Sequence, residues 1–229
     1  MGLLIGIIGV MLGVFVLLIA TILISDNFIS YGKKNILGCI QQLRYQFEKS
    51  KTIILIPLIT CFISICIYHQ HGISIEFFKF LFFMFMMVLI GYIDFKTTYV
   101  YRITTLITLI GGLAIIILES WILGRFPMDN LLGALIGFIV IGLIVLITRG
   151  MGEGDIEIAA LCGLFLGVVG SILTLFLGIV FGGIGGAILL ARQAKGLKDE
   201  MAFGPYLMVG AMISMLWGAR IFEMYLTLF

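Results

Sequence analysis

Residues 2–24 read GLLIGIIGVMLGVFVLLIATILI, an apolar run without a charged side chain. A membrane-spanning helix needs about 17–25 consecutive, mostly apolar residues, so this run is long enough to cross a bilayer. Further runs of this kind predict eight spans, at residues 3–24, 52–68, 77–94, 103–119, 130–148, 156–169, 171–191 and 204–220. The sixth run is short, and we expect it to meet the seventh in a tight hairpin near Gly170 and Ser171.

The composition supports the same fold class. Of the 229 residues 62% are hydrophobic and 11% are charged, whereas soluble domains are about half apolar and about a quarter charged. Backbone polar groups in lipid must bond within their own segment, and these continuous runs lack the alternation of a β-barrel. We therefore predict an all-α polytopic membrane protein without a soluble domain. It comprises a two-helix segment (1–76), with a short polar loop at 25–51, and a six-helix core (77–229).

The distribution of basic residues predicts the orientation. Three of the fourteen lysines and arginines, Lys79, Arg125 and Arg220, fall on one side of the predicted spans. The other eleven share the opposite side, which the positive-inside rule places in the cytoplasm, with both termini outside. A net charge of +2 provides no basic face for nucleic acid.

Acidic residues are few, and most are expected to be solvated in loops or at span ends: Asp26, Glu48, Glu76, Glu119, Asp129, Asp199, Glu200 and Glu223. Asp94 ends the third span and Asp155 begins the sixth, at the same predicted membrane boundary. A single aspartate at a helix end is often only a cap. Two carboxylates that meet share one proton, so one can act as a base and the other as an acid on a water molecule.

Such a pair can hydrolyse an amide without a metal or a covalent intermediate. Other chemistries lack support in the sequence. Its four cysteines form no CxxC pair, and the two histidines, His69 and His71, are expected to be solvated in an outer loop rather than to be ligands. No GxSxG, HExxH or phosphate-binding loop is present.

Residues 150–155 read GMGEGD and continue into residues 156–167. Ile93 and Asp94 end an earlier span, and residues 203–211 read FGPYLMVGA. These segments resemble the GxGD segment, the first catalytic segment and the late Phe-Gly-Pro stretch of the bacterial type IV prepilin peptidases. They occur in the family's order over roughly residues 80–220.

This resemblance implies a membrane-embedded aspartic endopeptidase. It would cut the basic leader from prepilins or pseudopilins at the cytoplasmic boundary of the bacterial inner membrane. The implied partners are the lipid bilayer and the prepilin, with no metal and no cofactor. The resemblance implies that Asp94 and Asp155 are the catalytic residues. Gly152 and Gly154 match the glycines of the motif. Structural or substrate-positioning roles are expected for Glu157, Gly204 and Pro205.

The chain departs from the family's usual pattern at several points. Tyr101 stands where the family usually has a proline, and Glu157 where it usually has a lysine. The loop at 25–51 holds the single Cys39 in place of the two CxxC pairs of long members, which argues against methyl transfer. The acidic residues near the motif are expected to attract a basic leader: Glu153, Asp155, Glu157, Asp199 and Glu200.

Two alternatives stay open. One is a transporter or channel, although such proteins hold acids near the middle of the bilayer, and the fourth, fifth and seventh spans have no ionisable residue inside. The other is a catalytically inactive membrane scaffold of a pilus or secretion machine, which Tyr101, Glu157 and the short loop keep open. The sequence does not define the prepilin or the oligomeric state.

Overall fold

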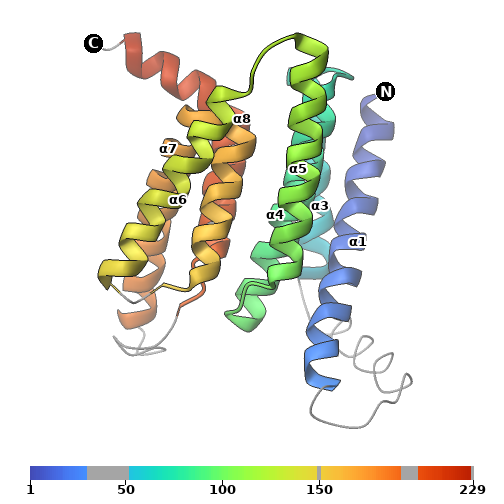
Figure 1. Cartoon of the computed structure of the whole chain (residues 1–229). Coiled ribbons are helices and arrows are strands. Elements are labelled where there is room, and N and C mark those ends of the chain that lie inside the picture. Colours follow the sequence, from blue (N-terminus) through green and yellow to red (C-terminus); the bar gives the residue numbers. More distant parts are fainter. Residues whose placement is uncertain (30–51, 149–150, 192–200, 228–229) are drawn as a thin grey trace. The chain divides into compact units, whose positions relative to one another are not determined.

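The computed structural model describes residues 1–29, 52–148, 151–191 and 201–227 (Figure 1). These residues form α1 (Gly2–Ile29), α3 (Thr52–His71), α4 (Ile75–Thr97), α5 (Arg102–Leu123), α6 (Met128–Thr148), α7 (Glu153–Ala191) and α8 (Gly204–Thr227), and they include no strand. All seven described helices are long and apolar enough to cross a membrane. The predicted all-α, polytopic membrane fold is confirmed.

Among the described residues, seven long helices are found where eight spans were predicted, because the predicted sixth and seventh spans are joined without a loop in one helical element, α7. The helix is interrupted at Gly167, whose φ of 71° and ψ of −169° lie outside the helical region. A positive φ is accessible to glycine without strain. The turn therefore falls at Gly167, a few residues before the predicted position at Gly170 and Ser171.

Contacts with the start of α8 show that α7 folds back on itself at this break. A Cβ atom built on Gly204 would lie 3.2 Å from Ile158, and one built on Gly182 would lie 2.8 Å from the ring of Phe203. In a straight helix, positions 158 and 182 would be about 36 Å apart. The two arms of α7, 153–166 and 168–191, are thus antiparallel, as Figure 1 shows.

Close glycine contacts hold each arm against a neighbouring helix. A Cβ atom on Gly133 of α6 would lie 2.5 Å from the carbonyl oxygen of Gly163 in the first arm. One on Gly178 of the second arm would lie 2.8 Å from Leu207 of α8. Small residues at such spacings let helix backbones approach closely in lipid.

An aromatic cluster joins α4 and α5 to the first arm of α7. The rings of Phe83 and Phe165 are stacked with centroids 4.7 Å apart, and Phe82 lies 6.1 Å from Phe165. Gly111 and Gly112 of α5 lie directly against the rings of Phe82 and Phe165. Because Phe83 and Phe165 are buried, this cluster packs the middle of α4 against the far end of the first arm of α7.

The chain divides into two compact units, Met1–Phe77 and Phe78–Phe229. In the first unit α1 packs on α3, and the buried hydroxyl of Thr60 donates a hydrogen bond to the carbonyl oxygen of Gly9. Helix α1 runs to Ile29 and so includes the start of the loop predicted at 25–51. The rest of that loop, residues 30–51 with Cys39, lies outside the described residues.

Candidate active site

Asp94 lies in the last turn of α4, and only 3% of its surface is exposed. Its Oδ2 accepts a hydrogen bond of 2.9 Å from the backbone N–H of Gly204, the first residue of α8. A carboxylate is disfavoured at the C-terminus of its own helix and favoured at the N-terminus of another, because of the helix dipole. Asp94 therefore acts as a cap for α8, satisfying one of the N–H groups that a helix start leaves unpaired.

The late Phe-Gly-Pro stretch is explained by this contact. A Cβ atom on Gly204 would lie 2.6 Å from the Oδ2 atom of Asp94, so a side chain there would push the carboxylate away. Pro205 occupies the second position of α8, where a missing N–H group costs nothing. Gly204 permits the close approach and Pro205 starts the helix.

Asp155 is the third residue of α7 and is 5% exposed. Its Oδ2 accepts a 3.2 Å hydrogen bond from the N–H of Gly152, and its own N–H donates to the carbonyl oxygen of Gly152. This reciprocal arrangement resembles a capping box. Gly154, between the two, lies against Val100, and a Cβ atom there would be 2.5 Å from the Val100 Cβ atom.

The structure brings Asp94, Asp155 and Gly204 to one end of the second unit, and the two carboxylates interact electrostatically. Within the described part of the chain, neither carboxylate forms an ion pair with a cation. Two buried acids without a counter-ion resist ionising together. Such a pair can share one proton and handle the protons of a single water molecule.

Glu157 faces a different neighbour from Asp155. Its Oε2 accepts a hydrogen bond from the Thr105 hydroxyl, and its Oε1 lies 3.6 Å from the Nε atom of Arg102. Sequence analysis did not single out Thr105. Of the acids expected to attract a basic leader, Asp155 is buried, Glu157 has these partners and Glu153 is exposed. Asp199 and Glu200 lie outside the described residues.

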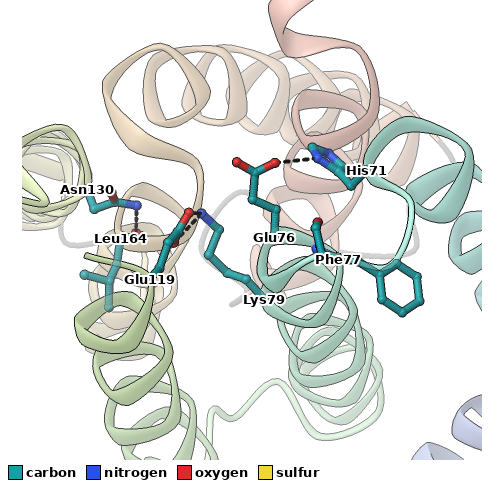
Figure 2. A network of polar contacts seen from close by, with 8 residues as sticks. His71, Glu76, Phe77, Lys79, Glu119, Asn130 and Leu164 are labelled. Carbon is teal, nitrogen blue, oxygen red and sulfur yellow. Dashed lines mark hydrogen bonds and ion pairs between the residues drawn. The ribbon is translucent and has the colours of Figure 1, made fainter. Parts of the chain in front are cut away.

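A buried ion pair lies at the other end of α4. Both carboxylate oxygens of Glu119 accept hydrogen bonds from the Lys79 ammonium, at 2.8 and 2.9 Å (Figure 2). The expectation that Glu119 is solvated is wrong, because its side chain is only 13% exposed. The signal for it was present in the sequence. Lys79 interrupts the aromatic run FFKFLFF at 77–83, and a charge within a span indicates a partner.

The predicted outer loop after the second span is also corrected. Helix α3 continues to His71, whose Nδ1 lies 2.8 Å from Glu76 Oε2 (Figure 2). Across the part of the chain that the structure covers, no three His, Cys, Asp or Glu side chains gather as a metal-binding group.

Comparison with known proteins bears on residues 81–187, which match the model of the Type IV leader peptidase family. This segment of the chain is similar to that family. The match includes Asp94, Gly152, Gly154, Asp155 and Glu157 and ends before Gly204 and Pro205. The resemblance inferred from the motifs is confirmed, and with seven apolar helices the chain is an integral membrane protein.

Three relatives are each named "Prepilin leader peptidase/N-methyltransferase". The protein of Pseudomonas putida is 37% identical over 100 residues, which cover 41% of this chain and 35% of the relative. That of Stutzerimonas stutzeri is 35% identical over 104 residues, 43% of this chain and 36% of the relative. That of Bacillus subtilis (strain 168) is 34% identical over 112 residues, 48% of this chain and 42% of the relative. The chain thus spans less than half the length of these relatives, and no solved structure matches it.

Proposed function

We propose that this chain is a membrane-embedded aspartic endopeptidase that cleaves the basic leader from type IV prepilins or pseudopilins. Asp94 and Asp155 activate the attacking water molecule at the cytoplasmic boundary of the bacterial inner membrane. The observation that carries the proposal is that two buried carboxylates from distant parts of the chain lie at one end of the second unit, neither of them in an ion pair within the described residues. The family match over 81–187 and the names of the relatives support the substrate class.

The chemistry follows from a pair that holds one proton. The ionised member takes a proton from water, and the resulting hydroxide attacks the carbonyl carbon of the scissile peptide bond. The protonated member gives its proton to the carbonyl oxygen. Together the two steps produce a tetrahedral intermediate. The C–N bond then breaks: the leaving nitrogen takes the proton that the first aspartate gained from water, and a hydroxyl of the intermediate returns a proton to the second aspartate. Each aspartate ends the cycle in its starting state.

The backbone contacts of the pair suit this chemistry. The N–H groups of Gly204 and Gly152 each donate to one oxygen of an aspartate, at 2.9 and 3.2 Å. Oxygens held by backbone groups are fixed in place, and pre-positioned groups need little reorganisation during the reaction. The second oxygen of each carboxylate is the atom that we assign to proton transfer.

The test is co-expression of the full chain with a prepilin from the same cell. The wild type should shorten the prepilin, and Asp94→Asn and Asp155→Asn should each leave it at full length. Glu223→Gln, an exposed acid at the far end of α8, serves as a control and should cleave normally. Cleavage that survives either aspartate change would refute the assignment of the pair.

An inactive scaffold is the alternative that Tyr101, Glu157 and the short loop leave open. It predicts a full-length prepilin with the wild type under every condition and with every cognate prepilin. The metal-free mechanism makes a separate prediction: adding a chelator should leave cleavage unchanged. Loss of cleavage on chelation, with recovery on adding back a divalent cation, would point to a metal-dependent peptidase instead.

A further inference from the structure

Glu157 connects the start of α7 to the start of α5. Its Oε2 accepts a hydrogen bond from the hydroxyl of Thr105, and its Oε1 lies 3.6 Å from Arg102 Nε. Thr105 is 3% exposed and the Glu157 side chain is 37% exposed, so this hydrogen bond is partly shielded from water. The Arg102 side chain is 78% exposed, so solvent and salt screen its attraction for Glu157. The hydrogen bond to Thr105 is therefore the stronger part of the contact.

A second contact lies beside the first. Val100, in the connection between α4 and α5, packs against Gly154 so closely that a Cβ atom on Gly154 would be 2.5 Å away. Residues 100–105 are thus held along residues 154–157 by one apolar contact and one hydrogen bond. Both aspartates belong to or adjoin these segments in the sequence: Asp155 lies within 154–157, and Asp94 lies six residues before Val100.

The short connection between α4 and α5 is itself well bonded. The N–H group of Thr98 donates to the carbonyl oxygen of Asp94 at 2.7 Å, and the φ of Thr98 is 53°. A threonine in this left-handed region is held there by its surroundings, because the conformation is costly for a β-branched residue. The Thr97 hydroxyl donates to the carbonyl oxygen of Ile93 at 2.8 Å. Whatever fixes Val100 and Thr105 on α7 therefore also fixes Asp94 relative to Asp155.

We propose that Glu157 and Thr105 are positioning residues that hold the Asp94–Asp155 pair in its working geometry, and that Glu157 does not bind the substrate's basic leader. The inference rests on the proposed function. Residues two apart on a helix point about 200° apart around its axis, so Glu157 faces α5 while Asp155 faces Asp94. Both oxygens of Glu157 have partners within the protein, and this leaves its charge engaged there.

The test measures cleavage of a prepilin by the purified full chain in lipid nanodiscs. Thr105→Val and Glu157→Ala should each lower kcat about 10-fold to 100-fold, the effect of slightly misplaced catalytic groups, with KM nearly unchanged. The double variant should be no worse than either single one, because both remove the same hydrogen bond. Glu157→Gln should restore most of kcat, since its amide oxygen still accepts from Thr105.

Thr108→Val is the matched control on the same helix. The Thr108 hydroxyl is buried and donates to the carbonyl oxygen of Thr104 within α5, so its removal should leave kcat at the wild-type level. If Thr105→Val behaves like Thr108→Val, the hydrogen bond positions nothing and the inference is overturned. Thermal unfolding measured in the same nanodiscs corrects each kcat for the folded fraction.

Substrate binding by Glu157 predicts a different pattern. Glu157→Ala would then raise KM for a basic leader, leave KM unchanged for a charge-neutral leader, and leave Thr105→Val without effect. That pattern would also overturn the inference. Failure of the proposed function is distinct from both outcomes, because either the wild type would then not cleave the prepilin or Asp94→Asn or Asp155→Asn would still cleave it.

Discussion

Helix α4 carries a buried ionisable side chain near each of its ends, and the two are treated in opposite ways. Near the start, Lys79 forms an ion pair with Glu119 of α5, which we call the ion-pair end. About 22 Å further along the helix, Asp94 faces Asp155 and the N-terminus of α8, which we call the carboxylate end. At the carboxylate end the two acids accept hydrogen bonds from backbone N–H groups, and neither forms an ion pair within the described residues.

The difference separates a structural role from a chemical one. In a buried ion pair, each charge compensates the other. Removing one partner leaves the remaining charge buried and uncompensated, which destabilises the fold. Two buried carboxylates without a counter-ion lower the stability of the fold, so their presence indicates a functional role. The ion-pair end should therefore govern stability, and the carboxylate end should govern activity.

The largest expected effect is on catalysis. Asp94→Asn or Asp155→Asn should lower the cleavage rate about 10²-fold to 10⁴-fold, the usual contribution of a general acid or base. The unfolding midpoint should stay the same or rise, because a buried charge is removed while the amide oxygen still accepts the backbone N–H group. Cleavage kinetics and thermal unfolding of the same preparation check both parts. A large fall in stability would mean that the two ends do not differ as described.

The next effect is on stability at the ion-pair end. Lys79→Met should lower the free energy of unfolding by about 3–5 kcal/mol, since it leaves Glu119 buried without its partner. Activity per folded molecule should remain near that of the wild type. The double variant Lys79→Met with Glu119→Gln should recover most of the loss. A fall in kcat without loss of stability would assign this pair to the chemistry instead.

A smaller effect distinguishes the two glycines that bond the aspartates. Gly204→Ala should destabilise by about 1–3 kcal/mol and reduce kcat, since its Cβ atom would meet Asp94 Oδ2 at 2.6 Å. Gly152→Ala should be tolerated, because its Cβ atom would lie 3.9 Å from Asp155 Oδ2, an ordinary contact. Equal effects of the two variants would show that the close contact of Gly204 with Asp94 does not position this carboxylate.

The smallest effect is expected at the exposed pair in the first unit. Glu76→Gln removes the contact with His71, and the side chain of Glu76 is 46% exposed. Exposed ion pairs contribute about 0–1 kcal/mol, so the unfolding free energy should change by no more than that. The cleavage rate should stay at the wild-type level. A loss as large as that expected for Lys79→Met would contradict the contrast between a buried and an exposed pair.

Local patterns predicted the helices well and their long-range partners poorly. The apolar runs located every described helix, although the runs could not show which glycine between 156 and 191 breaks α7. Gly167 turns the chain with a positive φ, while Gly170 is helical, and its carbonyl oxygen accepts a hydrogen bond from Ser214. Nothing in the spacing of these glycines distinguishes a residue that turns from one that packs.

The candidate site shows the same division. The contact of Asp155 with Gly152 spans three residues, so a local pattern of glycines before an aspartate at a helix start is enough to indicate it. The contact of Asp94 with Gly204 spans 110 residues. Motif order suggested that these segments belong together, but the spacing carried no information on which atoms meet. Glu119 was misjudged for the same reason, since Lys79 lies far away in the sequence.

The sequence by itself determined the class of this protein. Long apolar runs must become helices in lipid, because their backbone groups have no other partner there, and the scarcity of acids drew attention to Asp94 and Asp155. Only the tertiary structure decided what each acid meets. The fold of α7 at Gly167 places the starts of α7 and α8 at one end of the second unit. Packing between helices that are distant along the chain sets these contacts, and no local pattern encodes them.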